Sequence, residues 1–394
     1  MISVSEAKDI IRNTIELLPP ATIPLQQAAG YVLAADIYAS FDIPAFPQSA
    51  MDGYAFSFND YKYGEQLEIA GEVPAGIEKA FNDLSGKAVR IFTGAPVPQG
   101  TDTIVMQEKV TVENANILIL DDQLVKGSNV RPKGSEIEAG ALALPSRSFL
   151  SPAALGFLAG IGVSEVVVYP KPRITIIVTG KELQKPGRSL LPGQVYESNS
   201  ITVKAALQQI NIKDVRAVLV DDDLEILKTA LENALLTSDV VLLTGGISVG
   251  DYDFVLQAAN LCGVEKLFHK IKQRPGKPLY FGKKEEKLVF GLPGNPSSVL
   301  TCFYEYVIPA IEQLTARKDI IKVEHLPLSK TITKSTNLTH FLKGLNNGKT
   351  VSPLNAQESF RLSSFARANC LIILEENKED FREGDMVEVH LLPL

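Results

Sequence analysis

The chain is poor in the residues that build metal centres and disulfide frameworks. Its 394 residues include 3 cysteines and 4 histidines. Cys262, Cys302 and Cys370 are far apart in sequence and form no Cys-x-x-Cys or Cys/His ligand spacing, which argues against a structural zinc site. A sparse and odd cysteine count is typical of a reducing compartment, so we expect a cytoplasmic protein.

Long apolar runs are also scarce. The N-terminus carries Glu6, Lys8 and Asp9 where a signal peptide needs an apolar stretch. The segment Ser148–Ser164 has no charge, but it is shorter than the ~20 residues that a membrane span needs, and it contains Pro152 and three glycines. We therefore expect no secretion and no membrane span, and we interpret this segment as a buried, closely packed helix.

Positive charge is in deficit, because the net charge of the whole chain is −7. This argues against a nucleic-acid-binding protein that depends on bulk positive charge, but it does not exclude small anionic substrates. Cations gather in three windows, at 126–133, 171–188 and 266–277, and the last holds five Lys or Arg residues and no acid. A phosphate-binding P-loop is absent, and Gly160-Ile161-Gly162 lacks the third glycine of a dinucleotide motif.

The first half of the chain combines a helix with β structure. Ser3 and Glu6 form a capping-box pattern at the start of an amphipathic helix expected over 3–18. Residues 40–140 contain many glycines, prolines and short apolar runs, which indicate a β-rich region.

The second half changes to an alternation of continuous apolar strands and helices. The pattern predicts strands at 174–178, 215–220, 240–243 and 288–290, and helices at 200–210, 224–235, 254–261 and 297–314. This order is typical of a parallel sheet covered on both faces, an α/β fold. Past Arg317 we expect no helices and a small β domain with strands at 371–374 and 386–391.

Each strand of that sheet is followed by an unusual loop. Ligands of open parallel sheets bind beyond the carboxyl ends of the strands, so these loops predict a ligand rim. The loops are 179–183, 221–223, 244–253 and 291–298. Asp221–Asp223 could be a helix N-cap, and Asn295 or Ser297 could cap the next helix. Together the loops favour an anion site, in which Glu182, Asp222 and Asp253 could hold Mg²⁺.

One motif indicates a different kind of site, that of a serine hydrolase. Gly246–Gly250 matches Gly-x-Ser-x-Gly after a strand, so Ser248 could be the nucleophile of a serine hydrolase. The loop is longer than a tight nucleophile elbow and no oxyanion segment is evident, but the alternative stays open. The candidate bases are His269, His325, His340 and His390.

Eight segments occur in the order seen in a known family. They are Pro44–Ala55, Arg90–Pro98 with Met106-Gln107-Glu108, Val130–Gly134, Thr179–Leu183, Gly245–Asp253, Pro275–Pro278, Leu292–Pro296 and Leu362–Asn369. In these segments the chain resembles the MoeA family of molybdopterin molybdenumtransferases, also found as the E domain of gephyrin.

The resemblance implies an activity and an assembly. The enzyme would insert molybdate into adenylylated molybdopterin with Mg²⁺ and release AMP and the molybdenum cofactor. Its partners would be those two substrates, a second copy in an elongated homodimer and the adenylyltransferase MogA, with no nucleic acid and no membrane. The active site would lie between one subunit's α/β domain and the other subunit's β-rich domain.

The resemblance also implies four parts and a set of site residues. The parts are an elongated helical part (1–44 and 140–171), a β-rich insert (45–139), a MogA-like α/β domain (172–318) and a C-terminal β domain (319–394). The implied catalytic residues are Asp52, Thr93, Glu182, Asp222 and Asp253, of which the last three would bind the metal. The implied substrate-binding residues are Arg131, Gly245, Gly246, Ser248, Lys277, Pro293, Asn295, Pro296 and Ser297.

The chain departs from the family pattern at Lys181, where the family commonly has Asp. A paralogue that prefers tungstate, or a non-catalytic scaffold, is the alternative that this departure leaves open.

Overall fold

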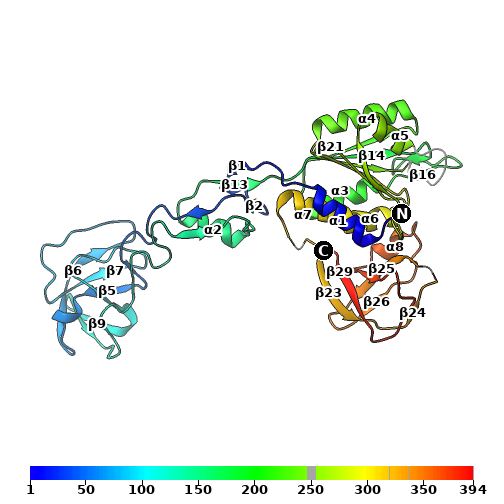
Figure 1. The fold of residues 1–394 in the computed structure, drawn as a ribbon. Helices are drawn as coiled ribbons and strands as arrows, with labels where there is room; N and C mark the ends of the chain where they lie inside the picture. The colour runs from blue at the N-terminus through cyan, green and yellow to red at the C-terminus, as the bar shows by residue number, and fades with distance from the viewer. Residues whose placement is uncertain (246–253, 319, 336, 394) are drawn as a thin grey trace. The chain divides into compact units, whose positions relative to one another are not determined.

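The computed structural model describes residues 1–245, 254–318, 320–335 and 337–393. The chain forms two compact units (Figure 1). Unit 1 comprises Met1–Ala34, Phe149–Ser151 and Val166–Leu394, and unit 2 comprises Ala35–Ser148 and Pro152–Glu165.

The largest sheet of unit 1 has six strands in the order β17-β14-β18-β22-β21-β19. The first four strands are parallel and confirm the predicted α/β sheet; they are β17 (Val215–Val220), β14 (Ile174–Thr179), β18 (Val240–Thr244) and β22 (Lys287–Leu292). The last two, β21 (Tyr280–Lys284) and β19 (Glu265–His269), extend the sheet antiparallel. We did not predict this extension, because charged residues interrupt its short apolar runs.

Helices cover both faces of this sheet (Figure 1). Side chains alternate along β14, so Ile176 packs in the core beneath α3 and α6, and Ile177 packs in the core beneath α4 and α5. The predicted helices are present as α3 (Asn199–Gln209), α4 (Leu224–Thr237), α5 (Phe254–Leu261), α6 (Pro296–Cys302) and α7 (Ile308–Thr315). A π-helical turn, η4 (Phe303–Val307), joins α6 to α7.

The N-terminal helix α1 (Val4–Thr14) starts as predicted and ends earlier than predicted. The Ser3 hydroxyl accepts the Glu6 N–H at 3.1 Å, and the Ser3 N–H donates to the Glu6 carboxylate at 2.7 Å, which completes the capping box. The predicted end at residue 18 is wrong, because the Leu18 N–H donates to the Leu314 carbonyl and the backbone is already extended at Ile15.

The C-terminal β part of unit 1 is a sheet in the order β20-β25-β27-β29-β23. Its strands are β20 (Gln273–Arg274), β25 (Thr339–Asn346), β27 (Cys370–Leu374), β29 (Met386–Leu391) and β23 (Lys322–Pro327), with β26 (Val351–Pro353) beside β25 and β24 (Ile332–Thr333) paired with β28 (Asp380–Phe381). The expectation of no helix past Arg317 is wrong, since α8 (Leu362–Phe365) lies here. Four residues are too few to produce a helical periodicity in the sequence.

Smaller elements complete unit 1. A three-stranded sheet has the order β1-β13-β2, with β1 (Ala21–Pro24), β13 (Glu165–Tyr169) and β2 (Val32–Leu33). The strands β15 (Leu183–Gln184) and β16 (Val195–Tyr196) pair in parallel just after β14. A 3-10 turn, η1, spans Leu25–Gln27.

Unit 2 is β-rich, as predicted. Its sheet has the order β8-β5-β7-β6-β10-β9, and apolar cores lie on its two faces, one containing Tyr54 and Phe56 and the other Ala55 and Val89. The strands are β8 (Thr103–Met106), β5 (Gly53–Phe56), β7 (Lys87–Ile91), β6 (Gln66–Val73), β10 (Asn116–Ile119) and β9 (Val110–Glu113). Two short pairs, β4 (Gln48–Ser49) with β11 (Val130–Arg131) and β3 (Ile37–Tyr38) with β12 (Leu142–Leu144), and the 3-10 turns η2 (Phe58–Asp60) and η3 (Gln107–Lys109) complete it.

The uncharged segment after residue 148 forms α2 (Pro152–Gly160), but the expectation that it is buried is wrong for this chain. Leu158 is its one buried residue. The sequence is apolar on all sides, and such a pattern does not determine which side finds packing partners. Across the described residues, no helix has the length and apolar character to cross a membrane.

Candidate functional site

The turn before β5 in unit 2 presents an oriented carboxylate. Asp52 Oδ1 accepts two hydrogen bonds from Thr93, one from the backbone N–H and one from the hydroxyl, each at 2.8 Å. These bonds, with a smaller contribution from the charge of Arg90, hold the pKa of Asp52 below its ordinary value. Asp52 is therefore ionised near neutral pH, and its Oδ2 accepts no hydrogen bond from any described residue.

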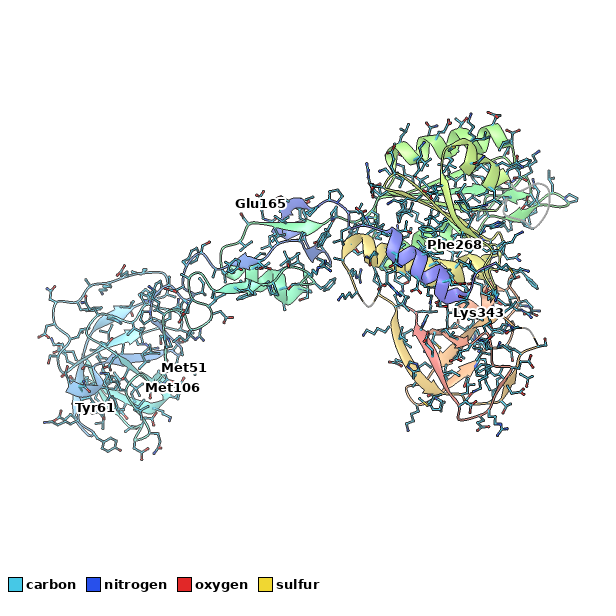
Figure 2. The ribbon with its side chains drawn as sticks, in the orientation of Figure 1. Met51, Tyr61, Met106, Glu165, Phe268 and Lys343 are labelled. Atoms are coloured by element: carbon cyan, nitrogen blue, oxygen red, sulfur yellow. The ribbon has the colours of Figure 1, made fainter. Side chains whose placement is uncertain are left out.

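Backbone pairing places Arg131 on a neighbouring segment of the same unit. β4 leads toward Asp52 and pairs on one side with Arg131 and on the other with Pro96, close to Thr93. The Gly94 N–H donates to the Ser49 carbonyl at 2.9 Å, which ties the two segments together. Met51, labelled in Figure 2, is exposed just before Asp52. The arrangement brings one carboxylate, one hydroxyl and one exposed guanidinium to adjacent segments.

In unit 1, several predicted loops meet at the carboxyl edge of the parallel sheet. The Thr179 hydroxyl donates to Asp222 at 3.1 Å. Gly245 approaches β14 so closely that an added Cβ would lie 2.1 Å from the Thr179 carbonyl oxygen, and a Cβ on Gly294 would lie 3.7 Å from the Gly245 Cα. Asp223 caps α4 by accepting the Glu225 and Ile226 N–H groups, so the N-cap interpretation is confirmed for Asp223, while Asp222 bonds across to β14.

Buried polar atoms without partners gather at the same edge. Asn199 Oδ1, Thr244 Oγ and Ser297 Oγ are buried, and among the described residues they have no hydrogen-bond partner. The Asn199 amide nitrogen donates to the Gly294 carbonyl at 2.9 Å, which places the start of α3 against the loop that leads to α6. An unpaired buried hydroxyl or carbonyl costs about 1–3 kcal/mol, so such a group is a signal for a ligand.

The loop before α6 starts the helix where the sequence predicted. Pro293 is buried, Asn295 is the N-cap residue and Pro296 is the first residue of the helix, but neither Asn295 nor Ser297 makes a capping hydrogen bond through its side chain. Asn295 donates instead to the Ser359 hydroxyl at 2.9 Å, and the Ser297 N–H donates to the Ser359 carbonyl at 3.0 Å. Ser359 comes from the C-terminal β part, and no sequence signal pointed to it.

The backbone of the segment that carries Lys277 is held by hydrogen bonds of buried side chains. The Gln273 side chain donates to the carbonyls of Pro275 and Gly276, and the Tyr306 hydroxyl donates to Gln273. Lys277 itself is exposed. The segment thus presents a cation from a fixed backbone beside α6.

A basic cavity of about 450 Å³ lies where this segment meets the C-terminal β part. Its lining includes Arg274, Lys330, Lys334 and His340. Burial, together with the charges of Arg274 and Lys334, lowers the pKa of His340 to about 4. The cavity suits an anion, and we missed it because its cations come from strands and loops distant in sequence.

Three predicted residues, Gly246, Ser248 and Asp253, lie outside the described residues. Glu182 is exposed after β14. The described part of the chain contains no group of three or more His, Cys, Asp or Glu side chains that could hold a metal. Glu182 and Asp222 nevertheless follow neighbouring strands, and Mg²⁺ commonly takes one or two carboxylates together with substrate phosphates, so the donors fit that ion.

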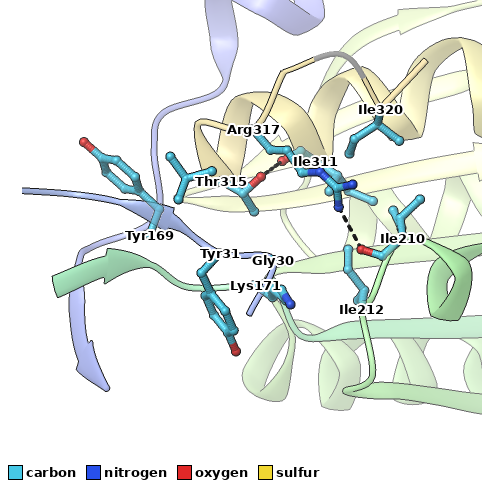
Figure 3. A pocket seen from close by; sticks show the side chains of 11 residues that line it. Gly30, Tyr31, Tyr169, Lys171, Ile210, Ile212, Ile311, Thr315, Arg317 and Ile320 are labelled. Atoms are coloured by element: carbon cyan, nitrogen blue, oxygen red, sulfur yellow. Dashed lines mark hydrogen bonds between the residues drawn. The ribbon is translucent and has the colours of Figure 1, made fainter. Parts of the chain in front are cut away.

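A second cavity is lined by Tyr31, Lys171, Ile210 and Arg317 among others (Figure 3). Arg317 donates to the Ile210 carbonyl at the end of α3 at 2.9 Å, and the Lys171 ammonium lies 4.1 Å from the centre of the Tyr31 ring. A cation at a helix C-terminus offsets the helix dipole, so we interpret these contacts as structural.

Comparison with known proteins covers nearly the whole chain. Family models match at residues 2–162 (MoeA N-terminal region, domains I and II), 175–313 (probable molybdopterin binding domain) and 325–392 (MoeA C-terminal region, domain IV). A molybdopterin molybdenumtransferase of Haemophilus influenzae is 33% identical, with all of both chains covered. One from Staphylococcus aureus strain Mu50 is 30% identical over 99% of this chain and 95% of that protein.

A solved structure agrees with the fold. The molybdopterin biosynthesis MoeA protein from Pyrococcus horikoshii matches with a TM-score of 0.82 and 31% identity, and 99% of each chain is covered. The sheet order, the loops at its carboxyl edge and these matches lead to one conclusion: the chain belongs to the MoeA family of molybdopterin molybdenumtransferases.

Proposed function

We propose that this chain is a molybdopterin molybdenumtransferase, which inserts molybdate into adenylylated molybdopterin and releases AMP. One observation carries the proposal: the carboxyl edge of the sheet, inside the part that matches a molybdopterin-binding domain, presents three buried polar atoms without described partners. These atoms belong to Asn199, Thr244 and Ser297: the two hydroxyls can donate to a phosphate, and the Asn199 carbonyl oxygen can accept from a pterin N–H.

The residues at that edge bind and orient the substrate. Gly245 allows close backbone approach, Lys277 supplies positive charge, and the Pro293–Ser297 loop supplies polar groups from a rigid backbone. Gly246 and Ser248 complete this set. Asp222, held by Thr179, would bind Mg²⁺ with Glu182 and Asp253. When bound, Mg²⁺ would neutralise charge on the two linked phosphates, whose P–O–P bond water cleaves to release AMP.

Unit 2 supplies a second set of groups. Asp52 stays ionised and presents Oδ2, while Thr93 fixes its orientation. Arg131 can bind an oxyanion such as molybdate through two parallel hydrogen bonds. In the proposed assembly these residues face the α/β domain of a second copy of the chain, so the homodimer completes the site. The four-part division, a cytoplasmic location and a hand-over of substrate from MogA belong to the same proposal.

Two of the four histidines that could serve as the general base of a serine hydrolase are unsuited to that role. His390 is held between Glu305 and Glu388 at 2.7 and 2.8 Å, and His340 is buried with its pKa at about 4. Neither histidine is available to activate a serine hydroxyl.

The experiment is a set of variants assayed for AMP release. We expect Asp52→Ala and Asp253→Ala each to lower turnover without unfolding the protein. Asp60→Ala is the control, because Asp60 is an exposed carboxylate of the same unit with no predicted role. Wild-type turnover in both test variants would refute the site assignment. Repeating the assay with tungstate would distinguish an altered metal preference.

A further inference from the structure

Arg90 lies beside Asp52 and is held from two sides. It follows from the register that Arg90 of β7 sits opposite Tyr54 of β5. Its guanidinium carbon lies 5.1 Å from the centre of the Tyr54 ring and 5.0 Å from the centre of the Phe92 ring. Cation–π contacts of this kind stabilise the cation at this place.

The same guanidinium also donates hydrogen bonds through its N–H groups. One nitrogen donates to the Gly53 carbonyl at 3.2 Å, and another donates to the Gln107 side chain at 2.5 Å. Gly53 is the residue after Asp52, and the Gln107 N–H donates to the Asp52 carbonyl at 3.0 Å. Arg90 therefore holds the backbone that adjoins Asp52, directly at Gly53 and through Gln107 at Asp52 itself.

The charge of Arg90 also acts on the carboxylates nearby. Hydrogen bonds from Thr93 are the main cause of the lowered pKa of Asp52, and the hydrogen bond from Gln107 is the main cause for Glu108; the charge of Arg90 lowers the pKa of both a little further. Glu72 of β6 is the cross-strand neighbour of Arg90 on its other side. Arg90 is thus a cation with Asp52 and Glu108 nearby and Glu72 opposite it on the next strand.

We propose that Arg90 is a positioning residue of the transferase, which holds the Asp52 turn in place through its hydrogen bonds to Gly53 and Gln107 and sets its positive charge beside the Asp52 carboxylate. This inference rests on the proposed role of Asp52. Lysine at this position would retain the charge, but an ammonium lacks the planar fork with which Arg90 donates to the Gly53 carbonyl and the Gln107 side chain at once.

The test compares Arg90→Met, Arg90→Lys and Asp52→Asn in AMP release across pH. We expect Arg90→Met to lower kcat about tenfold with little change in KM, and to move the acidic limb of the profile to higher pH. Arg90→Lys should leave the acidic limb near its wild-type position and recover part of kcat. Arg147→Met, a change at an exposed arginine of unit 2, is the control and should match wild type.

A double variant separates positioning from a merely structural role. If Arg90 acts through Asp52, Arg90→Met should have no further effect on kcat in the Asp52→Asn background. Independent, multiplying losses would overturn the inference, as would a wild-type kcat and pH profile in Arg90→Met. If Asp52→Asn alone retains wild-type turnover, the proposed function of Asp52 fails. A ¹³C NMR titration of the Asp52 carboxyl then decides on Arg90: an unchanged midpoint in Arg90→Met overturns the inference, and an upward shift supports it.

Discussion

Thr93 donates both of its hydrogen-bonding groups to one oxygen of Asp52, with the N–H and the hydroxyl each 2.8 Å from Oδ1. Both bonds favour the ionised carboxylate. They also fix its orientation, so that the second oxygen is left to interact with a ligand. The acceptor is organised by the fold before any substrate binds.

Removing the Thr93 hydroxyl tests this relationship. A hydrogen bond to a charged group contributes about 1.5–3 kcal/mol, so Thr93→Val should lower turnover at least about tenfold. It should also raise the pKa of Asp52 partway toward its ordinary value, since the backbone bond remains. Because Thr93 is exposed, thermal unfolding should change little. Thr93→Ser keeps the hydroxyl and serves as the control; equal turnover in the two variants would contradict the assignment.

Gly245 should resist substitution for a backbone reason. Its φ of +87° is unfavourable for L residues, and a Cβ would clash with the Thr179 carbonyl. We expect Gly245→Ala to destabilise the protein by about 1–3 kcal/mol, seen as a lower midpoint in urea unfolding. Gly294→Ala is the matched control, because its Cβ would meet only the Gly245 Cα at an ordinary 3.7 Å. Equal midpoints for the two variants would show that the close approach is absent.

A buried ionic cluster joins three elements of unit 1. Glu305, in the π-helical turn, accepts from Lys8 of α1 and from His390 of β29, each at 2.7 Å. Burial alone would raise the pKa of Glu305, but these positive charges outweigh it and lower the pKa to about 2. Burial likewise disfavours a charged His390, yet Glu305 and Glu388 raise the pKa of His390 to about 9.

The cluster predicts how stability depends on pH. The pKa of His390 is raised above its ordinary 6.5, so its contribution is complete below pH 6.5 and is lost as pH rises through about 9. The pKa of Glu305 is depressed below its ordinary 4.5, so its contribution is complete above pH 4.5 and is lost as pH falls through about 2. The thermal unfolding midpoint of the wild type should therefore fall as the pH rises from 6.5 to 9. The midpoint of His390→Gln should not depend on pH in this range. An identical slope in the two proteins would contradict the cluster.

Breaking the cluster on the carboxylate side should be costly. Glu305→Gln removes the shared partner of Lys8, which is partly exposed, and of the buried His390, which keeps only its contact with Glu388. Loss of one member of a buried ion pair costs about 3–5 kcal/mol. Urea unfolding at pH 6 measures this, with Glu286→Gln, in an exposed turn, as the control. A loss no larger than that of the control would exclude a strong buried interaction.

The pKa of Lys171 should be unusually low for a lysine. Burial, followed by the charges of Arg317 and Lys213, lowers the pKa of Lys171 to about 8. In competitive acetylation read by mass spectrometry, the reactivity of Lys171 should titrate with a midpoint near pH 8. Arg317→Met removes one of the depressing charges and should move the midpoint upward. A midpoint unmoved by that change would show that the charge of Arg317 does not depress the pKa of Lys171.

Strong periodicities made most of the α/β domain predictable. Some features depend only on a few neighbouring residues, so the sequence predicts them. Examples are the continuous apolar strand Val240–Thr244 and the capping box of Ser3 with Glu6. The antiparallel strands β19 and β21 were missed because they join the sheet through the pairing of β21 with β22, a tertiary contact that local sequence does not reveal. The π-helical turn Phe303–Val307 was invisible because its residues also suit an ordinary helix.

The candidate site was predictable in its loops and not in its contacts. The order of strands and loops led to Asp222 and Gly245 at one edge of the sheet. The bond between Asn295 and Ser359 joins residues 64 positions apart and needs the C-terminal β part to be in place. The same holds for the cavity at Arg274 and Lys334, whose residues meet only in the folded chain.

Release of AMP shows whether this chain carries out the final transfer of molybdenum. Purified protein would be incubated with adenylylated molybdopterin, and AMP would be quantified with molybdate and Mg²⁺ both present and with each omitted in turn. We expect catalytic release of AMP that requires molybdate and falls on removal of Mg²⁺. A folded protein that releases no AMP, or that releases it equally without molybdate, would exclude this activity.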